Sequence, residues 1–136
     1  MPILIDTSVW IDFFRADATP QVVRMRQIIR ESGPLMGDLI LAEIMQGVRE
    51  SEIGLVESTL RPLRVVPLVG EAIARQSARN YRQLRSRGIT VRKIVDCFIA
   101  TWCIENQVPL LHSDQDFAAF VALGLLEDLP FDRTVH

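Results

Sequence analysis

Short apolar runs alternate with longer amphipathic stretches along this chain. Four runs, at 2–6, 35–38, 64–68 and 109–114, each contain adjacent apolar residues, and three of them end in Asp. Apolar runs of this length with such ends are typical of buried strands. A fifth short strand is possible within 125–131.

The segments between these runs carry apolar residues at helical spacing. Pro20 stands near the start of one such segment, Gly33 and Pro34 follow its end, and Gly88 ends another, as helix termini favour. The predicted helices span 8–15, 20–32, 39–50, 52–60, 70–87 and 93–107, and a last one begins near Asp116.

Strands that alternate with helices imply right-handed crossovers and a parallel sheet covered on both faces. The sequence therefore predicts an α/β fold, a three-layer α/β/α sandwich with a central, mainly parallel sheet of four or five strands. A length of 136 residues with 49% hydrophobic content suits one domain, residues 1–136, with its own core.

The chain carries no signature of a membrane span or of a signal peptide, so a cytoplasmic protein without a membrane partner is expected. Cys97 and Cys103 share one predicted helix, about 9 Å apart along its axis, which is too far for a disulfide. Two cysteines without histidines at ligand spacing also make a zinc site unexpected.

The net charge of −2 hides a basic block, because no acid lies between Glu71 and Asp96. The cations of this block are Arg75, Arg79, Arg82, Arg85, Arg87, Arg92 and Lys93. Arg92 and Lys93 stand next to Asp96 and are the better candidates for phosphate contacts. Whether Arg82 and Arg85 bind RNA or only face solvent stays open at this point.

Five carboxylates follow the predicted strands: Asp6, Glu43, Asp96, Asp114 and Asp116. The carboxyl ends of parallel strands meet at one edge of a sheet, so these side chains can converge there. Each acid alone has a simpler explanation, as a helix cap, a helix-dipole partner or a solvated side chain.

Two of these acids have apolar neighbours, which favours a shared role. Glu43 lies beside Ile44, and Asp96 lies among apolar residues with Lys93 as the only local cation. Two carboxylates about 4 Å apart repel by roughly 4 kcal/mol at an effective dielectric near 20. A divalent cation offsets that repulsion, and ligands that are all oxygen favour Mg²⁺ or Mn²⁺. Such a centre indicates hydrolysis of phosphodiesters.

Four segments, "LIDTSVW", "LAEIMQG", "TVRKIVDCFIATWCIE" and "LLHSDQDF", resemble in order the acidic motifs of PIN-domain ribonucleases. The resemblance covers nearly the whole chain and is greatest for the VapC toxins of bacterial toxin–antitoxin pairs. It implies a PIN-like α/β fold, endonucleolytic cleavage of RNA with Mg²⁺ or Mn²⁺, a homodimer, and inhibition by a cognate antitoxin.

Carried over by position, the resemblance implies a metal-binding and catalytic quartet of Asp6, Glu43, Asp96 and Asp114. Asp116 matches a further acid whose share in metal binding varies within the family. Thr7 and Ser113 match polar positions whose hydroxyls can orient a carboxylate or a water.

Other conspicuous side chains receive structural interpretations. His112 is expected to pack or to form a hydrogen bond at the strand end rather than to ligate a metal. Trp10, Phe13, Phe14 and Trp102 are expected in the core or in a subunit contact, and the family resemblance places an antitoxin groove along the early helices.

Two alternatives to the nuclease remain. A phosphoaspartyl receiver or phosphatase also has Asp after its first strand, but it needs a second acid where this chain has Ile5 or Ser8. A non-enzymatic module that only binds RNA or a partner protein predicts no stabilisation by metal.

Overall fold

The computed structural model describes residues 2–130. Its elements follow one another as β1 (Leu4–Ile5), α1 (Thr7–Phe14), α2 (Pro20–Glu31), β2 (Met36–Gly37), α3 (Asp38–Gly47), η1 (Glu50–Glu52), α4 (Ile53–Leu60), β3 (Val65–Val66), α5 (Glu71–Ser86), α6 (Ile94–Asn106), β4 (Leu110–Leu111) and η2 (Gln115–Leu123). Within the described part of the chain, no helix is both long and apolar enough to cross a membrane.

All pairings between the strands are parallel. Strand β1 pairs with β4, and β2 pairs with β3. Isolated bridges join Leu4 to Leu35 and Leu110 to Glu127. The bridge between Leu4 and Leu35 links the two strand pairs, so the strands follow one another in the order β3, β2, β1 and β4.

The hydrogen-bonded strands are shorter than the predicted ones, and after β1 and β2 a helix begins almost at once. Asp6 follows β1 and caps α1, and α3 begins at Asp38, the residue after β2. The acids at the ends of the strands therefore belong to helix starts. The carboxyl edge of the sheet and these helix N-termini coincide, which is where α/β proteins place their sites.

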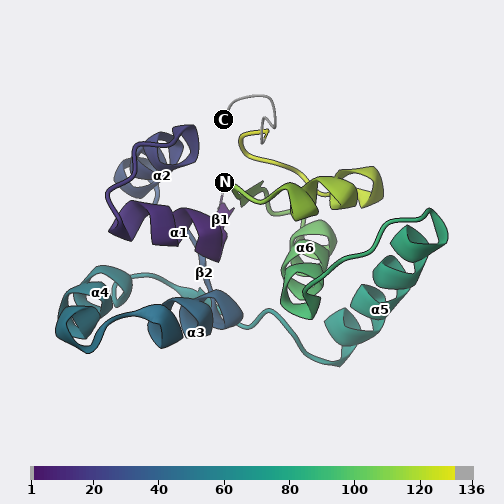
Figure 1. Cartoon of the computed structure of the whole chain (residues 1–136), viewed down its shortest axis with the longest axis horizontal. Helices are drawn as coiled ribbons and strands as arrows, with labels where there is room; N and C mark the ends of the chain where they lie inside the picture. Colours follow the sequence, from purple (N-terminus) through teal and green to yellow (C-terminus); the bar gives the residue numbers. More distant parts are fainter. Residues whose placement is uncertain (1, 131–136) are drawn as a thin grey trace.

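The strands lie at the centre, with α1 to α4 on one side in Figure 1 and α5 and α6 on the other. Leu4, Ile5, Leu110 and Leu111 are fully buried, as strands covered on both faces must be. These observations confirm the α/β class. The three-layer sandwich and its number of strands stay predictions.

Close packing between β2 and the segment after β3 fixes where α3 begins. A Cβ added at Gly37 would lie 2.3 Å from Cδ1 of Leu68, so no other residue fits there without a shift. The Asp38 carboxylate accepts a hydrogen bond from the backbone N–H of Leu68 at 3.0 Å. Helix α3, which carries Glu43, is thereby held against the sheet.

The basic helix α5 packs on α6 through buried polar contacts. Asn80 Nδ2 donates to Thr101 Oγ1 at 3.0 Å, and the Cys97 thiol donates to the carbonyl of Ser77. Cys97 and Cys103 are buried free thiols, as predicted. The arginines of α5 all lie on its exposed side.

The last predicted elements differ in detail. The helix expected from Asp116 is a 3₁₀ helix, η2, that begins at Gln115. The fifth strand is limited to the bridge at Glu127, and residue 131 of that prediction lies outside the described residues. The helix expected over 52–60 opens with one 3₁₀ turn, η1, before α4.

Candidate metal centre

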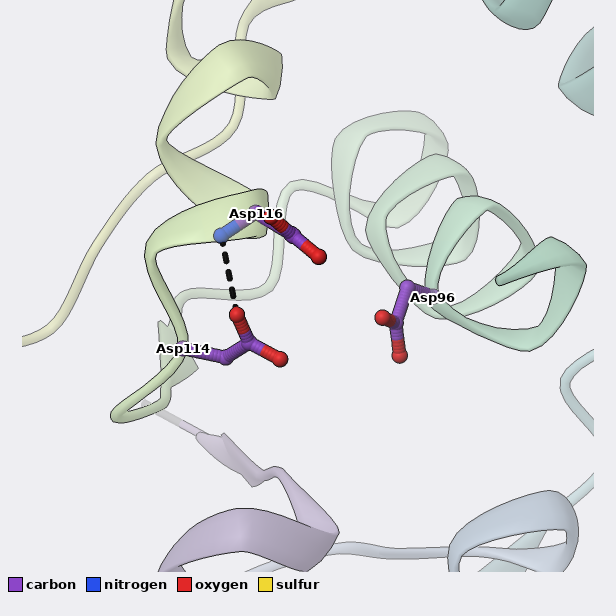
Figure 2. A group of neighbouring side chains, drawn as sticks. All are labelled: Asp96, Asp114 and Asp116. Carbon is purple, nitrogen blue, oxygen red and sulfur yellow. Dashed lines mark hydrogen bonds between the residues drawn. The ribbon is translucent and has the colours of Figure 1, made fainter. Parts of the chain in front are cut away.

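Three carboxylates from two parts of the chain come together at the carboxyl edge of the sheet. Asp96 projects from the first turn of α6, and Asp114 and Asp116 stand where β4 leads into η2 (Figure 2). One ligand oxygen from each lies within 4.8 Å of the others. We call Asp96, Asp114 and Asp116 the acidic cluster.

Asp96 occupies the most unfavourable position for a charge. Only 6% of it is exposed, and its Oδ2 has no hydrogen-bond partner among the described residues. Burial raises the pKa of Asp96 to about 7, with further repulsion from Asp6 and Asp114. Lys93 lowers this pKa only in part. An uncompensated buried carboxylate of this kind calls for a cation.

Asp6 borders the acidic cluster and has a structural task of its own. Its side chain caps α1 and accepts hydrogen bonds from the Ser8 N–H at 3.0 Å and the Ser8 hydroxyl at 2.6 Å. Burial raises the pKa of Asp6 despite these bonds, and the charge of Glu43 adds to the rise. Asp6 is therefore a helix cap and, at the same time, a candidate residue of the site.

Glu43 reaches the same region from the middle of α3. The Thr7 hydroxyl donates to Glu43 Oε1 at 2.7 Å, across 36 positions of sequence. This bond fixes one carboxylate oxygen and leaves the other available. Glu43 is partly buried, and its charge also raises the pKa of Asp96.

Ser8, the first residue of the helix predicted over 8–15, links the two sides of the site. Ser8 Oγ donates to Asp6 Oδ2 and accepts the backbone N–H of Ser113 at 3.2 Å. Ser113 thus contacts Ser8 through its backbone N–H. The position of the Ser8 hydroxyl two residues after Asp6 could have indicated the contact with Asp6. The contact with Ser113 spans 105 positions and cannot be seen in the sequence.

Asp114 and Asp116 are held together by a local turn. The backbone N–H of Asp116 donates to Asp114 Oδ1 at 2.9 Å, the dashed line in Figure 2. Arg92 Nη2 lies 3.6 Å from Asp116 Oδ1, with most of the arginine side chain exposed. An exposed pair at that distance contributes about 1 kcal/mol or less, so it does not neutralise the cluster.

The residues present suit a hard divalent cation. The ligand oxygens of the cluster lie within 4.8 Å of one another, near enough to share one hard cation that prefers oxygen ligands. The unpartnered Oδ2 of Asp96 is free to ligate, and no nitrogen or sulfur atom joins the group. The oxygen-only donor set favours Mg²⁺ or Mn²⁺ over zinc.

His112 does not face this group as a ligand. Its ring is completely buried and bonded to Glu127 and to the backbone of Asp114. The prediction that it packs and hydrogen-bonds at the strand end is confirmed.

Two hollows flank the site. One, of about 600 Å³, lies between α5 and α6 and is lined in part by Tyr81, Arg82, Arg92 and Phe98. The other, of about 470 Å³, borders Glu43 between α1, α3 and α4. Arg85 lies exposed on α5, and Lys93 is the residue that precedes α6.

The aromatic side chains of α1 form one group of stacked and edge-to-face contacts. Trp10 is buried, as predicted, while Phe13 and Phe14 are partly exposed. The ring of Trp10 stacks on Phe14 at 5.9 Å, and Arg26 lies over Phe13 at 5.0 Å. Phe14 also lines the hollow beside Glu43.

This fold and this group of acids define a class of protein. Residues 3–123 match the family model "PIN domain", and the chain belongs to that family. Two solved structures share the fold: "Structure of FitAB bound to IR36 DNA fragment" (TM-score 0.74, 19% identity, 92% of each chain) and "Crystal Structure of FitAcB from Neisseria gonorrhoeae" (TM-score 0.72, 19% identity, 98% and 99%).

Within the family, the relatives in sequence are VapC ribonucleases. "VapC ribonuclease Mb1587" of Mycobacterium bovis and "Ribonuclease VapC11" of Mycobacterium tuberculosis are each 34% identical over 135 residues, covering 95% of this chain and 98% of theirs. "Ribonuclease VapC19" of Mycobacterium tuberculosis is 34% identical over 113 residues, 82% of this chain and 87% of its own. The resemblance seen in the four acidic motifs is confirmed.

Proposed function

We propose that this protein is a toxin of the VapC type, a metal-dependent endoribonuclease that is inhibited by a cognate antitoxin. The single observation that supports a metal ion is the buried Asp96 Oδ2, which has no hydrogen-bond partner among the described residues and lies near carboxylates that repel it. The names of the relatives support RNA as the substrate. We further propose a single domain over residues 1–136 that acts in the cytoplasm.

Each acid has a proposed part in the reaction. Asp96 and Asp114, with Asp116, hold the ion, while Asp6 and Glu43 complete the site from α1 and α3. Mg²⁺ or Mn²⁺ bound there would screen the phosphate charge and lower the pKa of the attacking water. Thr7 and Ser8 keep the Glu43 and Asp6 carboxylates in place, and Ser113 joins Asp114 to Asp6 through Ser8.

The basic residues beside the site are proposed to hold the RNA. Arg92 and Lys93 border the acidic cluster, and Arg82 lines the hollow between α5 and α6. A group of acids repels a polyanion, so cations at its border must hold the phosphates. Arg85 lies on the same helix and extends this surface.

The antitoxin is proposed to occupy the hollow beside Glu43. Its lining combines the apolar Ile11, Phe14 and Val56 with charged side chains of both signs, Arg15, Arg49, Glu43 and Glu52. An amphipathic segment that carries apolar and charged residues fits such a surface and would close access to Glu43. We also expect a homodimer, as the family resemblance implies.

RNA cleavage with and without metal tests the proposal. The wild-type protein should cut RNA only with Mg²⁺ or Mn²⁺, and its products should lack 2′,3′-cyclic phosphates because water is the nucleophile. Asp96→Asn should lower the rate by roughly 100-fold or more. Glu105→Gln, an exposed acid further along α6, is the control and should keep the wild-type rate. Wild-type rates in Asp96→Asn, or full activity in EDTA, would contradict the proposal.

A further inference from the structure

A buried histidine stands directly behind the acidic cluster and outside it. His112 follows β4, has no exposed surface, and lies with its ring 5.0 Å from that of Phe117. Its Nδ1 accepts the backbone N–H of Asp114 at 3.2 Å. Its Nε2 lies 2.6 Å from Glu127 Oε2. The ring therefore stands between a carboxylate and the backbone of a residue in the acidic cluster.

These two contacts fix which ring nitrogen carries the proton. A backbone N–H can only donate, so Nδ1 must present its lone pair to Asp114. The proton of the neutral ring then lies on Nε2, and an ionised Glu127 carboxylate accepts it. The opposite tautomer would set a ring N–H against the N–H of Asp114 and leave Nε2 and the carboxylate without a proton between them.

Glu127 is itself held firmly in register with β4. The Leu110 N–H donates to the Leu126 carbonyl at 2.8 Å, and the Asp128 N–H donates to the Leu110 carbonyl at 3.0 Å. Asp128 is further bound to Arg24 of α2 through two hydrogen bonds. The carboxylate that faces His112 is therefore anchored on both sides by its neighbours in the chain.

We infer that His112 and Glu127 form a positioning pair for metal binding: Glu127 stabilises the Nε2–H tautomer of His112 that the Asp114 N–H requires, and His112 holds the backbone of Asp114. The Asp114 carboxylate then accepts from Asp116, so the hold on Asp114 extends to two of the three acids of the cluster. Groups that orient metal ligands in this way typically change metal affinity by about 10-fold to 100-fold when they are removed. This inference rests on the proposed metal site.

A matched pair of substitutions at His112 tests whether its Nδ1 is needed as the acceptor for the Asp114 N–H. Asn and Leu have nearly the same shape, but only Asn offers an oxygen near the place of Nδ1. Mn²⁺ binding to the metal-free protein, measured by calorimetry, should weaken about 10-fold or more in His112→Leu and much less in His112→Asn. Hydrogen exchange of the Asp114 amide should be slow in wild type and in His112→Asn and fast in His112→Leu.

Substitutions at the carboxylate test the tautomer. In Glu127→Gln the amide can donate to Nε2, so the proton can move to Nδ1. The ¹⁵N shifts of His112 should then change from a single tautomer to a mixture, and Mn²⁺ affinity should fall. Glu105→Gln, at an exposed acid of α6 that takes no part in these contacts, is the control. It should leave both the tautomer of His112 and the Mn²⁺ affinity unchanged.

The outcomes separate this inference from the proposed function. Failure of the wild-type protein to take up Mn²⁺ would overturn both. The wild-type protein could bind Mn²⁺ while His112→Leu and His112→Asn show equal affinities, whether both reduced or both unchanged. That result would overturn the role of His112 and leave the proposed function in place. An unchanged tautomer and affinity in Glu127→Gln would overturn the role of Glu127, and this variant also decides the question if His112→Leu fails to fold.

Discussion

Asp96 is a residue whose ionised side chain lowers the stability of the fold that contains it. Its pKa of about 7 means that the folded chain retains a proton that the unfolded chain releases near pH 4. Burial is the first cause, and the charges of Asp6, Asp114 and Glu43 add to it, with Lys93 as the opposing cation. The residue is unfavourable for stability and becomes useful once a cation is bound.

The pH dependence of stability follows from this shift. Between about pH 4 and pH 7 the folded state binds more protons than the unfolded state, so the free energy of unfolding of the metal-free protein falls as pH rises. The difference between the two pKa values corresponds to roughly 4 kcal/mol at most. Asp96→Asn should reduce this fall and raise stability at pH 8, while the raised pKa of Asp6 keeps part of the fall.

Urea unfolding in EDTA at pH 5 and pH 8 measures this effect. The wild-type protein should lose stability between the two values, and Asp96→Asn should lose less. Glu105→Gln carries the same loss of charge on an exposed part of α6 and should follow the wild type. A large destabilisation in Asp96→Asn at pH 8 would assign Asp96 a structural role.

At the scale of the elements, helices that begin directly after short strands bring the acids to one edge. The positions of the helices were predictable, because their apolar spacing and their Pro and Gly termini are local properties. The strands were predicted too long. For β1 and β2 the reason is that the sequence does not show that α1 begins at Thr7 and α3 at Asp38. The 3₁₀ geometry of η2 was also not predictable from apolar spacing.

The contact between β2 and Leu68 gives a test at this scale. Gly37→Ala places a methyl group 2.3 Å from Leu68 Cδ1 and should destabilise the protein by about 1–3 kcal/mol. Gly47→Ala, at the end of α3, meets nothing within 4 Å and should leave stability equal or slightly higher. Thermal unfolding of the two variants measures the difference, and equal melting temperatures would show that Leu68 moves aside freely.

For the whole molecule, the proposed site draws on four distant segments and is expected to close around a bound cation. Asp6 lies after β1, Glu43 on α3, Asp96 on α6, and Asp114 after β4. Mutual repulsion among these groups loosens the metal-free fold, and a bound ion removes that repulsion. Metal binding and global stability should therefore be coupled.

Thermal unfolding with added Mn²⁺ measures this coupling. At a free concentration near 100 times the dissociation constant, the ion should stabilise the folded state by about 2.7 kcal/mol, which raises the melting temperature by several degrees. The rise should vanish in Asp96→Asn and persist in Glu105→Gln. An equal rise in all three proteins would indicate unspecific binding.

The sequence by itself determined the helices, the α/β class, the family, and the acids that are candidates for the site. These properties depend on the order and spacing of side chains within one segment, and the motifs preserve that order. It also indicated that Cys97 and Cys103 form no disulfide, because one helix separates them by a fixed rise.

Only the tertiary structure decided which acids meet and what holds them. It grouped Asp116 with Asp96 and Asp114, gave Ser8 two partners, and set His112 between Glu127 and Asp114. Carboxylate oxygens act over a few ångströms, whereas the residues that carry them stand up to about a hundred positions apart. That short range makes these contacts a property of packing between segments, which no single segment of the sequence contains.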